Sequence, residues 1–318
     1  MLDLLHDVLR QATARGASEA DAFLVEEQSA SALVRMGEPE TVTHAREGRL
    51  ALRVLVGKAS ASASTSDLSR DSLDGLVREA IGLARLAAPD PLAGLPDPGA
   101  LATEVPDLDL HDPEGHRLTP EQKIALAKEA EASALSADSR ITNSEGAEFL
   151  DRQATYFYAC SHGFAGSYRT SRFSLVVSPV AVENGEMQRE SWYTTGRKRA
   201  RLDPPEEVGR IAAERAIRRL GARKMKTVEV PVIFDPLTAA SLVRSLAAAA
   251  SGPALYRGTS FLLNRLGSRI AAREVTLVDD GTMRGALGSK PFDGEGLATC
   301  RTVVVQDGLL KSYLLDTY

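Results

Sequence analysis

The sequence predicts an α+β protein built from three successive units, and three observations support this prediction. Runs of residues with strand character recur along the 318 residues and meet at turn signals such as Asn184-Gly185 and Asp307-Gly308. Apolar residues at helical spacing flank these runs. A proline-rich stretch, residues 89–120, divides the chain. Because strands joined by tight turns pair antiparallel, we expect antiparallel sheets covered by helices.

The first unit, residues 1–88, is predicted to be a sheet covered by two helices. Leu5 and Leu9 lie at helical spacing near the N-terminus, whereas Leu52 and Val54 alternate with polar neighbours as in a strand. The expected elements are a helix at 2–13, extended segments at 20–28 and 31–36, strands at 50–57 and, in preference to a loop, at 58–66, and a helix from 67 or 69 to about 87.

Residues 89–120 are predicted to form a linker. Their seven prolines are too dense for a helix or strand, because proline lacks the N–H that both elements use. His111 and His116 lie here beside acidic residues, a pattern that could bind a metal ion. We expect a solvated loop instead, because ligands on a flexible loop are not preorganised.

The middle unit, residues 121–226, is predicted to be an antiparallel meander with helices. Thr119 and Pro120 supply a cap and a first-turn proline for a helix that runs to about Leu135. Asn184-Gly185 is the strongest hairpin signal of the chain. The other expected elements are strand segments at 140–158 with a turn at 143–146, a hairpin turn at 161–163, strands at 173–182 and 187–194, and a helix at 206–220.

The third unit, residues 227–318, is predicted to be a mostly β module with an inserted strand and helix. The β-branched run Val228–Phe234 predicts a buried strand. Asp235 and Pro236 then begin an alanine-rich helix, expected to be close-packed in the core, which ends at Ser251-Gly252-Pro253. No capping element follows the last strand, so the module is expected to be incomplete. Its further elements are a helix to about 271, a strand at 275–278, an acidic glycine-rich turn at 291–296 and a hairpin at 302–315.

Composition limits the classes of function. The formal net charge is −5, so no overall positive field attracts nucleic acid. No run of about 18 apolar residues occurs, so we expect no membrane span, and the N-terminus lacks the pattern of a signal peptide. The two cysteines, Cys160 and Cys300, have no metal-binding spacing and fit a reducing compartment. We therefore expect a cytoplasmic protein.

Three long stretches together resemble one known family. They contain VPVIFDPLTAAS from Val230, PFDGEGLAT from Pro291 and ACSHGFAGSYRT from Ala159. In their order along the chain they resemble the PmbA/TldD family, and within it the PmbA (TldE) branch. The resemblance covers essentially the whole chain, although family members continue beyond the position of Tyr318. This chain is therefore expected to be truncated at its C-terminus.

The resemblance implies a part in a heterodimeric metallopeptidase that acts on unfolded or extended peptides. In this family the TldD-like subunit carries an HExxxH helix, whose histidines bind zinc and whose glutamate is the general base. The matching positions in this sequence are Arg244, Ser245 and Ala249. None of them can ligate zinc or act as a carboxylate base. The resemblance thus implies a non-catalytic PmbA-like subunit without a cofactor of its own, with zinc in a TldD-like partner.

The resemblance also places candidate residues for a peptide cleft. The expected partners are a TldD-like subunit, or a second copy of this chain, and an extended peptide held by backbone pairing. A turn that satisfies its own backbone is the simpler interpretation of the acidic segment, and two carboxylates alone make a weak cation site. The candidate cleft residues are Arg257, Gly258, Thr259, Asp293, Glu295 and Gly296.

Two other functions remain open from the sequence. Cys160 or Cys300 could be the nucleophile of an independent hydrolase, but neither has a histidine at a suitable spacing. A non-enzymatic protein that binds nucleic acid or modulates DNA gyrase is the second alternative. Its support is the segment Arg197–Lys226, which has eleven Lys and Arg against four Asp and Glu. A solvated helix face explains these charges better, so we expect no nucleic-acid partner.

Overall fold

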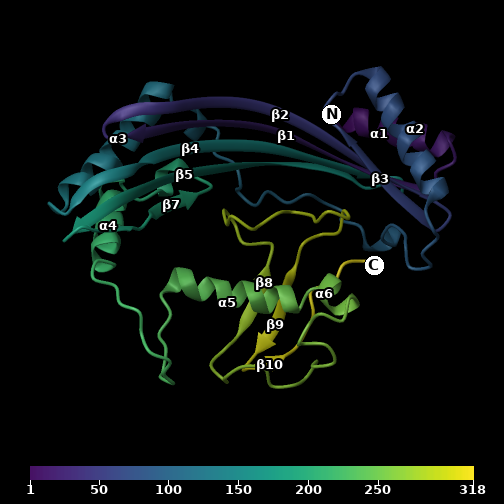
Figure 1. The fold of residues 1–318 in the computed structure, drawn as a ribbon. Coiled ribbons are helices and arrows are strands. Elements are labelled where there is room, and N and C mark those ends of the chain that lie inside the picture. Colours follow the sequence, from purple (N-terminus) through teal and green to yellow (C-terminus); the bar gives the residue numbers. More distant parts are fainter.

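The computed structural model describes residues 1–318, and its main feature is a seven-stranded antiparallel sheet that arches over a smaller C-terminal module (Figure 1). The strand order is β3-β2-β1-β4-β5-β6, with β7 also paired to β5. Strands of the first and middle predicted units therefore share one sheet. The strands are β1 (Glu19–Arg35), β2 (Glu38–Val56), β3 (Ala59–Thr65), β4 (Ile141–Cys160), β5 (Ala165–Glu183), β6 (Glu186–Arg189) and β7 (Trp192–Gly196).

Four helices cover the two ends of one face of this sheet, which we call the outer face. Helices α1 (Leu2–Ala14) and α2 (Arg70–Leu86) pack on Leu24, Leu50 and Leu52 at one end. Helices α3 (Pro120–Ser136) and α4 (Pro205–Arg218) pack on Phe149, Phe173 and Leu175 at the other. Side chains alternate between faces along a strand, and the register places Gln28 and Gln153 between the two helix pairs on this face.

The proline-rich segment forms a strap, residues 89–118, which lies on the opposite, inner face in its first part, reaches the β5 edge at Leu110 and ends on the outer face at His116. Helical turns η1 (Pro98–Ala100) and η2 (Gly115–Arg117) are its regular elements. Leu95 and Leu101 are buried beside Tyr158 and Phe292. The strap also bonds to both parts of the fold: Lys58 Nζ donates to the Ala93 carbonyl at 2.8 Å, and the Ala102 N–H donates to the Gly296 carbonyl at 2.9 Å. This segment is thus a packed connection between sheet and module.

The C-terminal module has its own small core and contacts the inner face through aromatic rings. Its core contains Ala249, Leu262 and Val305. The ring of Phe292 meets those of Phe164 and Tyr168 edge-on, with centroids 5.2 Å apart in each pair. The elements are α5 (Pro236–Ala249), α6 (Gly252–Tyr256), β8 (Leu277–Asp280), β9 (Arg301–Gln306) and β10 (Leu309–Leu310). No helix of the chain is both long and apolar enough to span a bilayer.

Capping and turn chemistry confirm the predicted antiparallel elements. Ser69 caps α2, and Thr119 and Gln122 form a capping box on α3. Asn184 and Gly185 have φ of 51° and 82°, the left-handed pair that a two-residue hairpin needs, and they join β5 to β6. Asp307-Gly308 likewise joins β9 to β10. Residues 58–66 form a strand, as predicted.

Four local predictions were wrong, each because packing overrode a local pattern. Val228–Phe234 has no strand partner, and Ile233 is 98% exposed. Helix α5 is largely exposed rather than close-packed, because the sheet does not cover it. Residues 261–271 form turns rather than a helix. Residues 143–146 form a β-bulge inside β4, with the register shifting between Ser144 and Ala147.

Candidate functional site

The positions that the family resemblance assigns to a zinc-binding helix lie on α5, and their side chains do not fit zinc. Arg244 and Ser245 are exposed, and the Ser245 hydroxyl donates to the Ser241 carbonyl at 2.9 Å. Ala249 is buried in the core of the module. A guanidinium has no lone pair for a metal, and alanine has no donor atom. No cluster of three or more His, Cys, Asp or Glu side chains is arranged to hold a metal ion elsewhere in the chain.

Arg257, Gly258 and Thr259 form the end of α6. The Thr259 N–H donates to the Ala254 carbonyl and the Gly258 N–H to the Leu255 carbonyl, which together make a Schellman motif. Gly258 has φ of 65°, so glycine suits this position for conformational reasons. Gly258 and Thr259 therefore have a structural role here. The Arg257 side chain forms no ion pair.

The acidic turn satisfies its own backbone through Asp293. One oxygen of that carboxylate accepts the N–H groups of Glu295 and Leu297 at 2.8 and 3.0 Å. Gly296 has φ of 82° and lies against the rings of Tyr158 and Phe164, where a Cβ would come within 2.9 Å of both. Glu295 accepts two hydrogen bonds of 2.9 Å from the backbone and hydroxyl of Thr317. Glu295 therefore connects the turn to the end of the chain, whereas Gly296 connects it to the strap and the sheet.

A hollow of about 690 Å³ brings Arg257 close to the partner of Glu295. We call it the terminal hollow; it is lined by residues 252, 253, 255–257 and 315–318, but not by Gly258 or Thr259. Thr317, which binds Glu295, forms part of its wall. The rings of Tyr256 and Tyr318 meet edge-on at 5.6 Å. The side chains of Arg257 and Asp316 and the two tyrosine rings can contact an extended peptide segment, and no histidine or cysteine lines the hollow.

The Tyr318 hydroxyl ties the terminal hollow to the strap. It donates to Asp90 at 2.6 Å, and this hydrogen bond lowers the pKa of the Asp90 carboxyl. The same bond raises the pKa of Tyr318. The wall of the hollow is therefore anchored to the sheet side of the molecule through a charge-assisted hydrogen bond.

An ion pair lies in the sheet next to the acidic turn. Arg53 donates to both oxygens of Asp21 at 2.9 Å, and the Tyr158 hydroxyl donates to Asp21 at 3.1 Å. Burial alone would lower the pKa of Arg53. The hydrogen bonds and charge of Asp21 outweigh burial, and the negative charge of Glu295 adds to their effect, so the pKa is raised. Burial, followed by the charge of Asp21, raises the pKa of Tyr158. This network fixes the sheet surface against which Gly296 packs.

The two strap histidines are packed, which corrects the expectation of a solvated loop. The side chain of His116 is 9% exposed, and its Nε2 lies 3.0 Å from the Ser171 hydroxyl. Its Nδ1 lies 3.5 Å from Asp151. The ring of His111 stacks on His116 with a centroid distance of 6.0 Å, and burial lowers the pKa of His111. Both ring nitrogens of His116 have protein partners, so the pair does not form a metal site.

A buried ion pair that was not predicted from the sequence lies beside these histidines. Lys123 Nζ lies 2.6 Å from an oxygen of Asp151, and both side chains are 8% exposed. Burial would raise the pKa of Asp151, but His116 and Lys123 outweigh it and the pKa is lowered. A signal was available, because Lys123 has the same helical spacing as Ala127, Ala130 and Ala134, which face the core.

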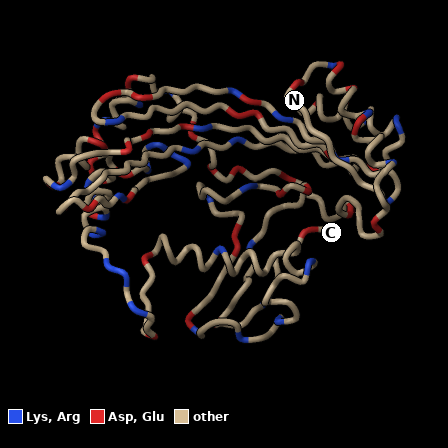
Figure 2. The backbone as a smooth tube through the Cα atoms, in the orientation of Figure 1, with Lys and Arg blue, Asp and Glu red and all other residues tan.

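The two alternative functions gain no support from the site geometry. Cys160 is buried, and the nearby His162 binds the Pro96 carbonyl at 2.8 Å through Nδ1. Cys300 is exposed and its sulfur lies near the Thr302 hydroxyl rather than a base. In the segment Arg197–Lys226, five of the eleven basic side chains are engaged within the protein: Arg197 binds carbonyls, and Lys198, Arg210, Arg215 and Arg219 form ion pairs. Figure 2 shows further basic positions in the connection between α4 and α5.

Comparison with protein families accounts for all three parts of the chain. The model of PmbA/TldA metallopeptidase domain 1 matches residues 20–84, that of the central domain matches residues 113–220, and that of the C-terminal domain matches residues 227–318.

Two curated relatives align with nearly the whole chain. The metalloprotease PmbA of Escherichia coli O157:H7 is 39% identical over 288 residues, which are 91% of this chain and 64% of that protein. The metalloprotease PmbA homolog of Haemophilus influenzae is 35% identical over 307 residues, 96% of this chain and 67% of that protein. The chain thus spans about two thirds of the length of these relatives.

Solved structures have the same fold. The protein BT3649 of Bacteroides thetaiotaomicron, described as a candidate modulator of DNA gyrase, superposes with a TM-score of 0.93 at 30% identity, covering 99% of this chain and 72% of that one. TldE from Thermococcus kodakarensis superposes with a TM-score of 0.85 at 20% identity, covering 98% and 70%. The second likeness concerns the fold alone.

Proposed function

This chain belongs to the PmbA/TldD family of metallopeptidases, and we propose that it is a PmbA/TldE-type subunit that assists peptide cleavage without binding the catalytic zinc. In this proposal a TldD-like subunit supplies the zinc and the general base. The present chain supplies structural support and part of the surface that holds an unfolded or extended peptide. We place the complex in the cytoplasm, because Cys160 and Cys300 are both unpaired.

The observation that carries the proposal is the chemistry of α5. Its three positions corresponding to HExxxH offer a guanidinium, a hydroxyl already bonded to the Ser241 carbonyl, and a methyl group buried in the core. These groups cannot replace two imidazoles and a carboxylate. The residues do not fit zinc, so no catalytic step is assigned to this chain.

The exposed apolar surface of the module supports a role in assembly. Leu242 and Val243 on α5 are 52% and 48% exposed, and Ile233 just before the helix is almost fully exposed. Exposed apolar surface on a soluble protein often marks a contact site for another protein. A TldD-like subunit is the occupant we propose, and a second copy of this chain is the alternative.

Peptidase assays with metal analysis test the proposal. The chain alone, a TldD-like subunit alone and their mixture would each be measured for bound zinc and for cleavage of an unstructured peptide. We expect cleavage in the mixture, zinc in proportion to the TldD-like subunit, and neither property in the present chain alone. Stoichiometric zinc together with cleavage by this chain alone would overturn the proposal.

A variant on α5 provides a matched test of assembly. Val243→Glu would put a charge on the exposed apolar surface, whereas Arg244→Glu changes the charge of the neighbouring exposed position. If the apolar face is the interface, Val243→Glu abolishes co-elution with the TldD-like subunit and Arg244→Glu has the smaller effect. Co-elution that is equally strong for both variants would remove this surface from the proposal.

A further inference from the structure

The edge of β5 nearest its first hairpin turn is open. β5 pairs with β4 along one side, while on the other side β7 covers Phe173–Val177 and β6 covers Val180–Glu183. The open edge ends at Ser171, whose N–H donates to the Leu110 carbonyl at 2.9 Å and whose carbonyl accepts from Arg197 at 3.0 Å. Residues 165–170 have no strand on this side.

Four backbone groups at this edge have no partner. The N–H and C=O of one residue in a strand point the same way, and the direction reverses at each residue. Since those of Ser171 point away from β4, those of Arg169 and Ser167 do so too. Neither residue makes a hydrogen bond on that side. Two donors and two acceptors therefore stand at strand spacing along an uncovered edge, which is the template for an added strand.

A hollow of about 380 Å³ lies directly beside these groups. We call it the β5 hollow; its walls are residues 105–111 of the strap, Ser167, Tyr168, Arg169 and Pro291. Before Leu110 the strap runs beside the edge without pairing to it, and after Leu110 it passes to the outer face, where His111 lines a pocket together with Arg169. The open backbone groups thus face a space with two sides, one formed by the strand and one by the strap.

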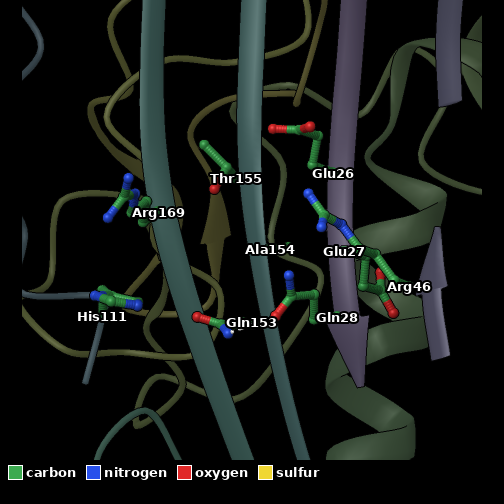
Figure 3. A pocket seen from close by; sticks show the side chains of 9 residues that line it. All are labelled: Glu26, Glu27, Gln28, Arg46, His111, Gln153, Ala154, Thr155 and Arg169. Atoms are coloured by element: carbon green, nitrogen blue, oxygen red, sulfur yellow. Dashed lines mark hydrogen bonds between the residues drawn. The ribbon is translucent and has the colours of Figure 1, made fainter. Parts of the chain in front are cut away.

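The side chains around the β5 hollow differ between the two faces of the sheet. Arg169 belongs to the outer face and forms no ion pair; Figure 3 shows it beside β5 together with His111, on the side away from Gln28 and Arg46. Tyr168 belongs to the inner face, where it stacks on Tyr156 at 4.9 Å and meets Phe292 edge-on. A strand added here would place alternate side chains near a cation and near apolar rings.

We propose that an extended peptide binds as an added strand along β5 at Ser167 and Arg169, with acidic residues facing Arg169 alternating with apolar residues facing Tyr168. Backbone pairing supplies affinity for any extended segment, and the two faces supply the preference for the pattern. This proposal rests on the proposed function and adds to it a position on this chain where the peptide binds. Binding at β5 itself needs neither zinc nor a second subunit.

Fluorescence polarisation with a labelled octapeptide of alternating Asp and Val tests the site on the chain alone. Ser167→Pro removes an outward N–H at an edge position that tolerates proline, and Arg169→Glu reverses the charge. We expect each variant to weaken binding about tenfold or more, a loss of about 1.4 kcal/mol or more. Arg172→Glu, an exposed arginine of the same strand on the inner face, is the matched control and should change the affinity less than about twofold.

Two further measurements guard against misfolding of a variant. The peptide is made with alternate residues N-methylated in both registers, and one register should abolish binding to the unmodified protein because it lacks the N–H groups that face β5. Hydrogen exchange of the unmodified protein should show new protection at Ser167 and Arg169 when peptide is present. Equal binding of both methylated peptides, or no added protection, would overturn the site.

The outcomes separate this site from the function. Cleavage by the mixture with a TldD-like subunit, unaffected by Arg169→Glu and with no binding at β5, would overturn the site and leave the proposed function intact. Binding at β5 with no cleavage in any mixture would support the peptide site and contradict the proposed function.

Discussion

The carboxylate of Asp21 and the guanidinium of Arg53 form a two-pronged ion pair between β1 and β2, with both N–O distances at 2.9 Å. The two residues face each other directly in the strand register. The Tyr158 hydroxyl of β4 joins from the other side, so one carboxylate connects three strands. Its position beneath the acidic turn makes this pair a support for the contact between sheet and module.

Asp21→Asn is therefore expected to destabilise the protein by about 3 kcal/mol, because it leaves Arg53 without its counter-charge in a half-buried position. Urea unfolding would measure the loss. Asp7→Asn on α1 is the control: its pair with Arg10 is 53% and 75% exposed, so the change should stay within about 0.5 kcal/mol. Similar losses for both variants would contradict the role assigned to burial.

Gly209 allows α3 and α4 to approach closely. A Cβ at this position would lie 2.2 Å from the Ala130 carbonyl and 2.8 Å from the Cβ of Ser133. Gly209→Ala should destabilise the protein by about 2 kcal/mol, because backbone of the facing helix must move. Gly82→Ala on α2, where nothing lies within 4 Å, should instead stabilise by about 0.5–1 kcal/mol. Thermal unfolding of the two variants compares them; the same sign of change in both would refute this account of the helix contact.

Gly296 is expected to control docking of the module on the sheet. Alanine there would be strained at φ of 82° and would place its Cβ 2.7 Å from the Tyr158 ring. Gly163 also has a left-handed φ, of 102°, but has nothing within 4 Å. Both variants carry the backbone strain. Any additional destabilisation in Gly296→Ala therefore comes from the clash of its Cβ with the Tyr158 ring. Limited proteolysis should show faster cleavage near the strap in Gly296→Ala than in Gly163→Ala; equal rates would contradict the prediction.

Ionised Asp151 should stabilise the folded protein, and this stabilisation should be lost at acid pH. Its pKa in the folded protein lies below the ordinary value of about 3.9, because Lys123 and His116 outweigh burial. A lowered carboxyl pKa contributes stability that is complete above about pH 4 and is lost as the pH falls through the folded value. Asp151→Asn should therefore cost about 3 kcal/mol at pH 7, and this difference from the unmodified protein should shrink below about pH 4.

Salt provides the control for this pH dependence. Asp138, whose side chain is 27% exposed, also has a lowered pKa, of about 2, first through its side-chain hydrogen bond with Arg140. Screening by about 1 M NaCl should weaken the contribution of Asp138 and spare most of that of Asp151, because buried pairs are screened less. Denaturant unfolding between pH 2.5 and 7 at two salt concentrations would measure both; equal sensitivity to salt would argue that the Lys123–Asp151 pair is accessible to solvent.

Features that depend on neighbouring residues could be predicted from the amino-acid sequence. Asn184-Gly185 specified its hairpin through φ, Thr119 and Gln122 specified a helix start, and the alternation in β2 specified a half-buried strand. These predictions succeeded because the physical cause and its effect lie within a few residues of each other. The family resemblance also rests on contiguous residues, and the site positions that it implies on α5 and in the acidic turn stay predictions.

Which surfaces are covered depends on long-range packing and could not be predicted from local patterns. The pairing of β1 with β4 joined two predicted units into one sheet, and it buried His116 and Lys123 around Asp151. The same packing left α5 and Val228–Phe234 uncovered and the edge of β5 open at Ser167 and Arg169. A strand or helix has the same local sequence whether or not another segment lies against it. Burial and pairing are set by contacts between residues far apart in the chain, and local patterns carry little information about them.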